Sequence, residues 1–163
     1  MKQTTHTHQA TRGGQTGKSV PDFVPKWMIK PDLIFDPDRA LKGFVRSGQV
    51  KNARQLIEHY GLNVDKSATL NQAELNRDLI AAVDRSDVDA VKRALDEGAN
   101  PRAAEYIMWG SSSHWVSVLL VAVTVSGGCG SDETRRKASD IVMLLEQKGV
   151  SLPFWQDPRE PFY

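Results

Sequence analysis

Apolar residues recur with helical spacing in three separate segments of the chain. The stripes consist of Val50, Ala53 and Ile57 in 45–64, of Val88, Val91 and Leu95 in 83–101, and of Ile141, Val142, Leu144 and Leu145 in 139–152. Residues spaced in this way lie on one face of an α-helix. The pattern predicts three amphipathic helices, each with one buried face.

Each predicted helix is followed by a glycine at the same relative place, namely Gly61, Gly98 and Gly149. A helix commonly ends with a left-handed residue, which glycine adopts without steric cost. We expect these glycines to end the three helices.

A shorter helix is predicted before each of the three. The segment before Val88 reads "DLIAAVDRS" and the segment before the third copy reads "SVLLVAVTVSG", so that Ala82 and Ala122 occupy matching positions, which Phe44 fills in the first copy. A small residue at such a position lets neighbouring helices approach closely. The sequence therefore predicts an all-α fold of antiparallel helix pairs stacked side by side.

The two ends of the chain differ from this helical region, which spans 38–152. Residues 1–37 hold Thr, Gln, His, Gly and the prolines Pro21 to Pro37, and they show no sustained helical period. We expect them to form a flexible or extended arm. Residues 153–163, "PFWQDPREPFY", combine proline with aromatic residues. We expect this tail to lie back over the final helix as a cap.

The middle copy, "LIAAVDRSDVDAVKRALDEGANP" (79–101), resembles the two-helix unit of an ankyrin repeat. In that resemblance, residues 87–91 open the second helix and residues 98–101 form the turn into the next finger. It implies a short ankyrin-like solenoid of about three repeats over 38–152, with a groove and fingers that hold another macromolecule. The third copy has Ser117-Val118-Leu119-Leu120 where the family has Thr-Pro-Leu-His. The glycine spacings of 37 and 51 residues exceed the family's period of about 33, so other stacked helical hairpins stay open.

Two insertions explain the long third copy, one at 102–115 and one at 127–137. Insertions in a repeat array map to loops, which often carry recognition residues. The candidate partner contacts of the first insertion are Tyr106, Met108, Trp109 and His114. The alternative is that Ile107, Trp109 and Trp115 fold down over the end of the stack. The second insertion adds Arg135 and Arg136, although a solvated helix start with acidic residues in its first turn explains these charges without a ligand.

The segment "RGGQTGKSV" (12–20) contains part of a phosphate-binding loop, but its spacing is wrong. Three residues instead of four separate Gly13 from Gly17, and prolines follow where a helix should begin. We therefore expect no nucleotide site there, and no cofactor. The four histidines and the single Cys129 are too scattered for a zinc site.

Charge and hydropathy suggest no nucleic-acid or membrane partner. The net charge is +1, with +4 on residues 1–30 and −3 on the rest. The longest apolar run, 116–125, has about half the length of a membrane-spanning helix, and no secretory signal is recognisable. A cytoplasmic location, or export without a cleavable signal, is expected.

These observations predict a monomeric, non-enzymatic module that binds a protein partner to inhibit, neutralise or tether it. One alternative is an effector delivered into another cell, with residues 1–37 as an export or chaperone-binding segment. Another is nucleotide or nucleic-acid binding through Lys18 and the basic arm.

Overall fold

The computed structural model describes residues 36–109, 112–128 and 130–153, and for 106–109 and 112–114 it describes the backbone. The expectations for the N-terminal arm, for the Gly17-Lys18-Ser19 segment, for Cys129 and for the tail beyond Pro153 concern residues outside these ranges.

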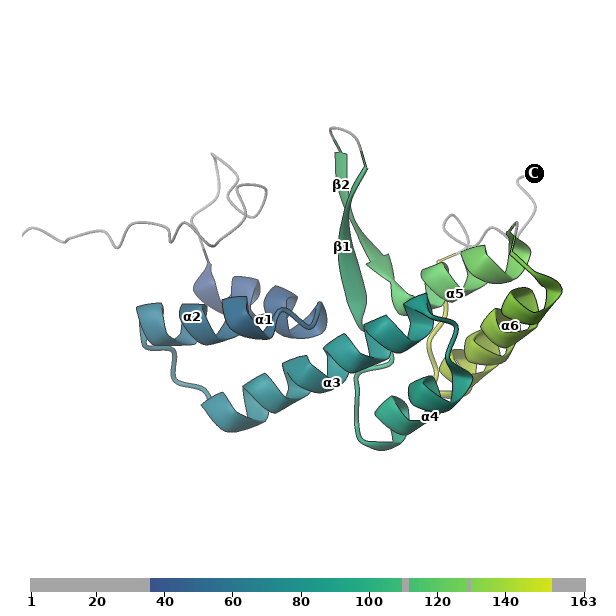
Figure 1. Ribbon diagram of the computed structural model, residues 1–163. Coiled ribbons are helices and arrows are strands. Elements are labelled where there is room, and N and C mark those ends of the chain that lie inside the picture. The colour runs from purple at the N-terminus through teal and green to yellow at the C-terminus, as the bar shows by residue number, and fades with distance from the viewer. Residues whose placement is uncertain (1–35, 110–111, 129, 154–163) are drawn as a thin grey trace, which may run out of the picture.

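The described chain forms three helix pairs and one hairpin (Figure 1). The pairs are α1 (Pro37–Arg46) with α2 (Val50–Tyr60), α3 (Lys66–Asp84) with α4 (Val88–Asp96), and α5 (Val118–Gly127) with α6 (Asp132–Gln147). The strands β1 (Ala104–Trp109) and β2 (Ser112–Ser117) form an antiparallel hairpin between the second and third pairs. The expected mostly helical fold is confirmed.

Local sequence signals explain where the helices begin and end. An Asp or Ser side chain precedes five of the described helices and accepts the N–H three residues further on; these residues are Asp36, Asp65, Asp87, Ser117 and Ser131. Such caps satisfy N–H groups that lack a partner within the helix. Gly61 directly follows α2, and Gly98 and Gly149 lie two residues after the last residues of α4 and α6; their φ angles are 59°, 101° and 77°, as predicted.

The turns inside the first two pairs are built alike. In α1–α2, Gly48 N–H donates to Val45 O and Gln49 N–H to Phe44 O; in α3–α4, Ser86 N–H donates to Val83 O and Asp87 N–H to Ala82 O. Gly48 and Ser86 have φ angles of 68° and 52°. These two pairs therefore share one turn geometry.

The core has two parts, and α3 contributes to both. Phe44, Leu56 and Leu70 belong to a cluster formed by the first pair and the start of α3. A larger cluster joins the end of α3 to α4, α5 and α6, and it contains both Ala82 and Ala122. Helix α3 lies beside α1, α2, α4 and α5, while α4 lies beside α6. The 19-residue α3 thus connects the two ends of the molecule.

The structure corrects one predicted helix length. The helix before Val88 was expected to be short, but α3 begins at Lys66 and is about twice as long as α4. Residues 66–84 contain neither glycine nor proline and are rich in Ala, Leu, Asn, Gln and charged residues. Because nothing in this segment breaks a helix, it continues from the Asp65 cap to the turn at Ser86.

A second correction concerns residues 102–115, which were expected to form a loop. Residues 104–117 form the β1–β2 hairpin instead. Tyr, Ile, Trp and Val favour the β-strand conformation. Two residues separate the strands, which is a common length for a hairpin connection.

Candidate functional site

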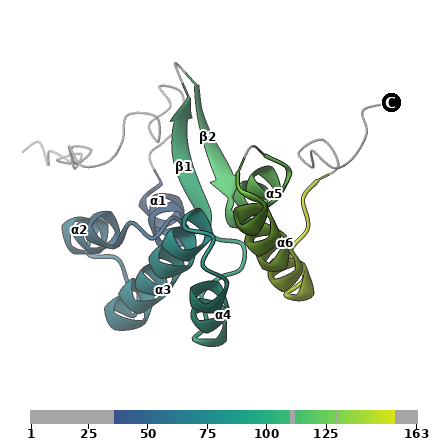
Figure 2. The ribbon, with the colours of Figure 1, turned by 45° about the vertical axis from the view of Figure 1, so that its right-hand side comes forward.

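The β1–β2 hairpin rises away from the three helix pairs, with its base beside α5 (Figures 1 and 2). Its register pairs Tyr106 with Trp115, Ile107 with His114 and Trp109 with Ser112. Because directly paired positions share a face and successive positions alternate, Tyr106 and Met108 belong to one face. Trp109 and His114 belong to the other face.

The base of the hairpin is fixed to the helical body by apolar packing and one backbone bond. The side chains of Ala103 and Ala104 are buried, and Val118 N–H donates to Ala103 O at 3.1 Å. Ser117 ends β2 and also caps α5. The start of β1 and the start of α5 are therefore held in one rigid corner.

Two carboxyl groups interact beside this corner. Burial raises the pKa of Asp84, at the end of α3, against an opposing effect of Arg85. Burial also raises the pKa of Glu105 on β1, and the charge of Asp84 raises it further. Glu105 is the one Asp, Glu, Lys or Arg residue in 104–117. The hairpin sequence is therefore nearly uncharged. Its one carboxyl group, Glu105, is repelled by Asp84 at the end of α3.

Polar contacts connect the segment before β1 to both ends of the molecule. Arg46 Nε donates to Arg102 O at 2.8 Å, and the Arg102 side chain donates to Gly149 O at 3.3 Å. Asn76 is 1% exposed; it donates to Val45 O and accepts from Asn100 N–H, both at 2.8 Å. A buried amide with these bonds fixes the relative positions of α1, α3 and the 98–103 segment.

An open groove of about 620 Å³ lies between α1 and α3. Its apolar lining includes Leu41, Val45, Val64 and Ala68, and its charged lining includes Asp38, Lys42 and Arg46. Asn100 lies at the side where the chain continues toward β1. Three residues, 101–103, separate Asn100 from the first residue of β1.

Comparisons with protein-family models, with curated proteins and with solved structures found no match to this chain. The site is therefore judged on its own geometry.

The structure separates the candidate contact residues into two groups. Tyr106, Met108, Trp109 and His114 all lie on the hairpin, although on two different faces. Trp115, which the sequence placed only in the alternative of an insertion folded over the stack, is 38% exposed and is paired with Tyr106. Arg135 and Arg136 lie in the first turns of α6, and the whole of α5 separates them from the hairpin base.

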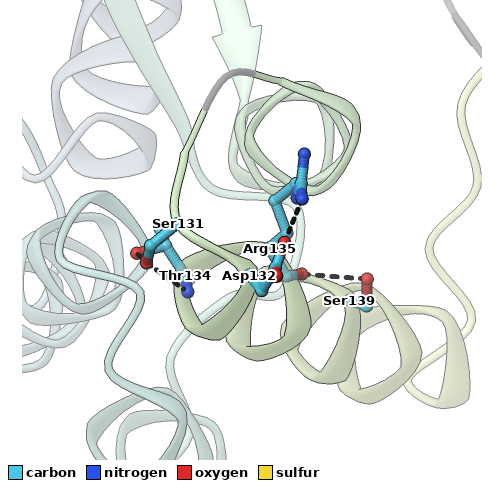
Figure 3. A network of polar contacts seen from close by, with 5 residues as sticks. All are labelled: Ser131, Asp132, Thr134, Arg135 and Ser139. Atoms are coloured by element: carbon cyan, nitrogen blue, oxygen red, sulfur yellow. Dashed lines mark hydrogen bonds and ion pairs between the residues drawn. The ribbon is translucent and has the colours of Figure 1, made fainter.

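The contacts at the start of α6 are those of a capped helix (Figure 3). Ser131 Oγ accepts Thr134 N–H at 3.1 Å, and Arg135 forms an ion pair with Asp132. Lys137 Nζ lies 2.7 Å from Glu133, and this bond lowers the pKa of Glu133. These bonds agree with the interpretation that the charges of this insertion stabilise the helix.

Among the residues that the structure describes, no three His, Cys, Asp or Glu side chains gather as metal ligands would. Among the same residues, no helix has both the length and the apolar character needed to cross a membrane.

Sequence reasoning missed several residues that shape this site. Arg46, Asn76 and Glu105 received no role, because each acts through a contact with a distant segment. The hairpin itself left a local signal, since "EYIMW" and "HWV" are rich in aromatic and branched residues and lie close together.

Proposed function

We propose that this protein is a non-enzymatic protein-binding module whose three helix pairs form an ankyrin-like array. In this proposal, the hairpin acts as an elongated finger between the second and third repeats. The matching turns at Gly48 and Ser86 support the array, as do the left-handed glycines that follow α2, α4 and α6.

One observation carries the proposal: an aromatic-rich hairpin stands away from the helices on a rigid base. A two-stranded hairpin in water is at best marginally stable by itself. Its sequence nevertheless contains Tyr106, Trp109 and Trp115, which are costly to leave in water and are typical of interface anchors. A partner that covers the hairpin explains both features.

The groove between α1 and α3 supplies a second contact area in this proposal. Apolar side chains of α1 and α3 line it together with Lys42 and Arg46. In this proposal, the partner that grips the hairpin also contacts this groove, whose lining residue Asn100 is close in sequence to the start of β1 at Ala104. Hairpin and groove together offer the combination of apolar and charged area that protein interfaces have.

The test is an affinity capture from the source cell's lysate with full-length protein, followed by mass spectrometry and by titration of the captured protein. We expect Trp109→Ala to weaken binding by about 1 kcal/mol or more while it leaves the melting temperature unchanged. Tyr106→Ala tests the opposite face of the hairpin in the same assay, because positions 106 and 109 lie on different faces.

The pair of variants distinguishes the outcomes. Loss of binding with one variant alone assigns the interface to that face of the hairpin. If the wild type and both variants retain the captured protein equally, the hairpin does not bind the partner. A large fall in melting temperature with Trp109→Ala places that residue in the fold instead of the interface.

A further inference from the structure

The proposed function uses the two faces of the hairpin and leaves the outer edge of β1 without a role. Among the described residues the sheet has two strands, so each strand pairs along one edge. Strand β2 also lies beside α5, whereas the extensive contacts of β1 are with β2. Figures 1 and 2 show that the hairpin, above its base, stands apart from the helices. Within the described structure, the outer edge of β1 is therefore the one that a further strand can approach.

The register of the hairpin determines which backbone groups of β1 point outward. Val118 N–H donates to Ala103 O at 3.1 Å, so these two residues form a hydrogen-bonded pair at the base. In an antiparallel ladder such pairs alternate with pairs that exchange no hydrogen bonds. The next hydrogen-bonded pairs are therefore 105 with 116, 107 with 114 and 109 with 112. The N–H and C=O groups that point away from β2 belong to Ala104, Tyr106 and Met108.

The sequence of the hairpin lacks the features that usually prevent sheet edges from pairing. Proteins protect edge strands with lysine, with proline or with a β-bulge. Residues 104–117 contain no lysine, arginine or proline, and the pairing of β1 with β2 continues from Ala104 to Trp109 without a bulge. An edge of this kind is a template for pairing with another strand.

A second copy of the chain supplies a strand that fits this edge. Two identical strands that pair antiparallel are related by a twofold axis, so each copy offers the same edge to the other. With the axis at Tyr106, the outward groups of Ala104 meet those of Met108, and Tyr106 meets its own counterpart. Glu105 then lies opposite Ile107, so the two carboxyl groups are diagonal neighbours instead of direct opposites. All three outward positions are paired in this register.

We propose that two copies of the protein associate through the outer edges of β1, antiparallel and with Tyr106 at the twofold axis, so that their hairpins form one four-stranded sheet. Because β2 lies beside α5, the sheet ends at β2 in each copy and the assembly closes as a dimer. The pairing uses backbone groups at the edge and leaves both faces of the hairpin to the partner of the proposed function. The inference therefore does not rest on that function.

Sedimentation velocity of the full-length chain, from about 1 µM to about 1 mM protein, tests the dimer. We expect a dissociation constant of about 100 µM or lower, as for small transient interfaces. Tyr106→Pro removes both hydrogen bonds of the central pair, and a sheet edge tolerates proline. This variant should therefore raise the dissociation constant by about tenfold or more, with an unchanged circular dichroism spectrum.

Two control variants separate the backbone effect from other effects. Tyr106→Ala removes the ring but keeps the N–H group, so it should weaken the dimer less than Tyr106→Pro does. Ser113→Pro makes the same backbone change on the outer edge of β2, because position 113 lies between the hydrogen-bonded positions 112 and 114. It should leave the dissociation constant unchanged.

A cysteine cross-link tests the register, in a chain whose Cys129 is first replaced by serine. Opposed residues of a hydrogen-bonded pair have Cα atoms about 5.5 Å apart, a distance that a disulfide can span. Tyr106→Cys should therefore form an intermolecular disulfide under mild oxidation. Met108→Cys is the control, because position 108 lies opposite Ala104 of the second copy; it should cross-link about tenfold more slowly.

Four results would overturn the inference. The first is a wild-type chain that remains monomeric at about 1 mM. The second is a dimer that Tyr106→Pro and Ser113→Pro weaken equally. The third is a Met108→Cys chain that cross-links as fast as Tyr106→Cys. The fourth is a monomer that loses its captured partner with Tyr106→Pro, because the edge would then pair with another protein. The cross-linking result stands even if Tyr106→Pro fails to fold.

Discussion

The first and second helix pairs close their turns with the same hydrogen bonds but fill equivalent positions with side chains of very different size. Phe44 and Ala82 accept the matching backbone bond, and both are buried, at 0% and 1% exposure. Phe44 fills the space between α1, α2 and the start of α3. Ala82 lets α3, α4 and α5 approach one another. A shared backbone pattern therefore sets the shape of a pair, while one side chain sets the distance to its neighbours.

A similar difference occurs one turn later, at Gly48 and Ser86. Both residues have left-handed φ angles. A Cβ atom on Gly48 would lie 2.5 Å from Arg77 Cα, so the turn of the first pair touches the backbone of α3. Ser86 carries a side chain at the equivalent place. The first pair thus docks on α3 through a turn, whereas the second pair contains α3 itself.

The largest effect is expected from Ala82→Glu. This change places a carboxylate among α3, α4 and α5, where no polar partner compensates for its burial, and should cost about 4 kcal/mol or more. Circular dichroism should show a largely unfolded chain at room temperature. An unchanged melting curve would contradict the equivalence of Ala82 and Phe44.

Phe44→Ala gives the first pair the small residue of the second. We expect a loss of about 3–5 kcal/mol in the free energy of unfolding, because the cluster of Phe44, Leu56 and Leu70 loses its largest member. Hydrogen exchange should quicken first in α1 and α2. A uniform increase over all six helices would show instead that the two clusters unfold as one unit.

Exchanging Gly48 and Ser86 between the two turns measures how much the close contact of the first turn with α3 contributes to stability. Gly48→Ser should cost about 2 kcal/mol or more, since the new Cβ meets the Arg77 backbone and the left-handed φ is unfavourable for serine. Ser86→Gly should change stability by about 1 kcal/mol or less. Urea unfolding of the two variants measures both values, and equal losses would contradict the docking role of Gly48.

The smallest effect concerns the acidic residues beside the hairpin. Because the folded state raises the pKa of Glu105, its ionised form is disfavoured there, and stability falls as the pH rises through that pKa. Glu105→Gln should therefore stabilise the protein at about pH 7 by a few tenths of a kcal/mol, a small value because solvent screens the group. The gain should vanish near pH 4. A variant less stable than the wild type at neutral pH would contradict the repulsion between Asp84 and Glu105.

Elements that depend on neighbours along the chain could be predicted from the sequence. The stripes ending in Ile57, Leu95 and Leu145 became helices, and Gly61, Gly98 and Gly149 ended them. The burial of Ala82 and Ala122 followed from the same helical period. Periodicity and capping work over a few residues, so a single sequence displays them.

The tertiary structure alone decided the features that join distant segments. The hairpin needs two strands and a base held by Ala103 and Val118, and the polar role of Asn76 needs Val45 and Asn100. A local pattern states which face of an element is apolar, but contacts between elements decide what covers that face.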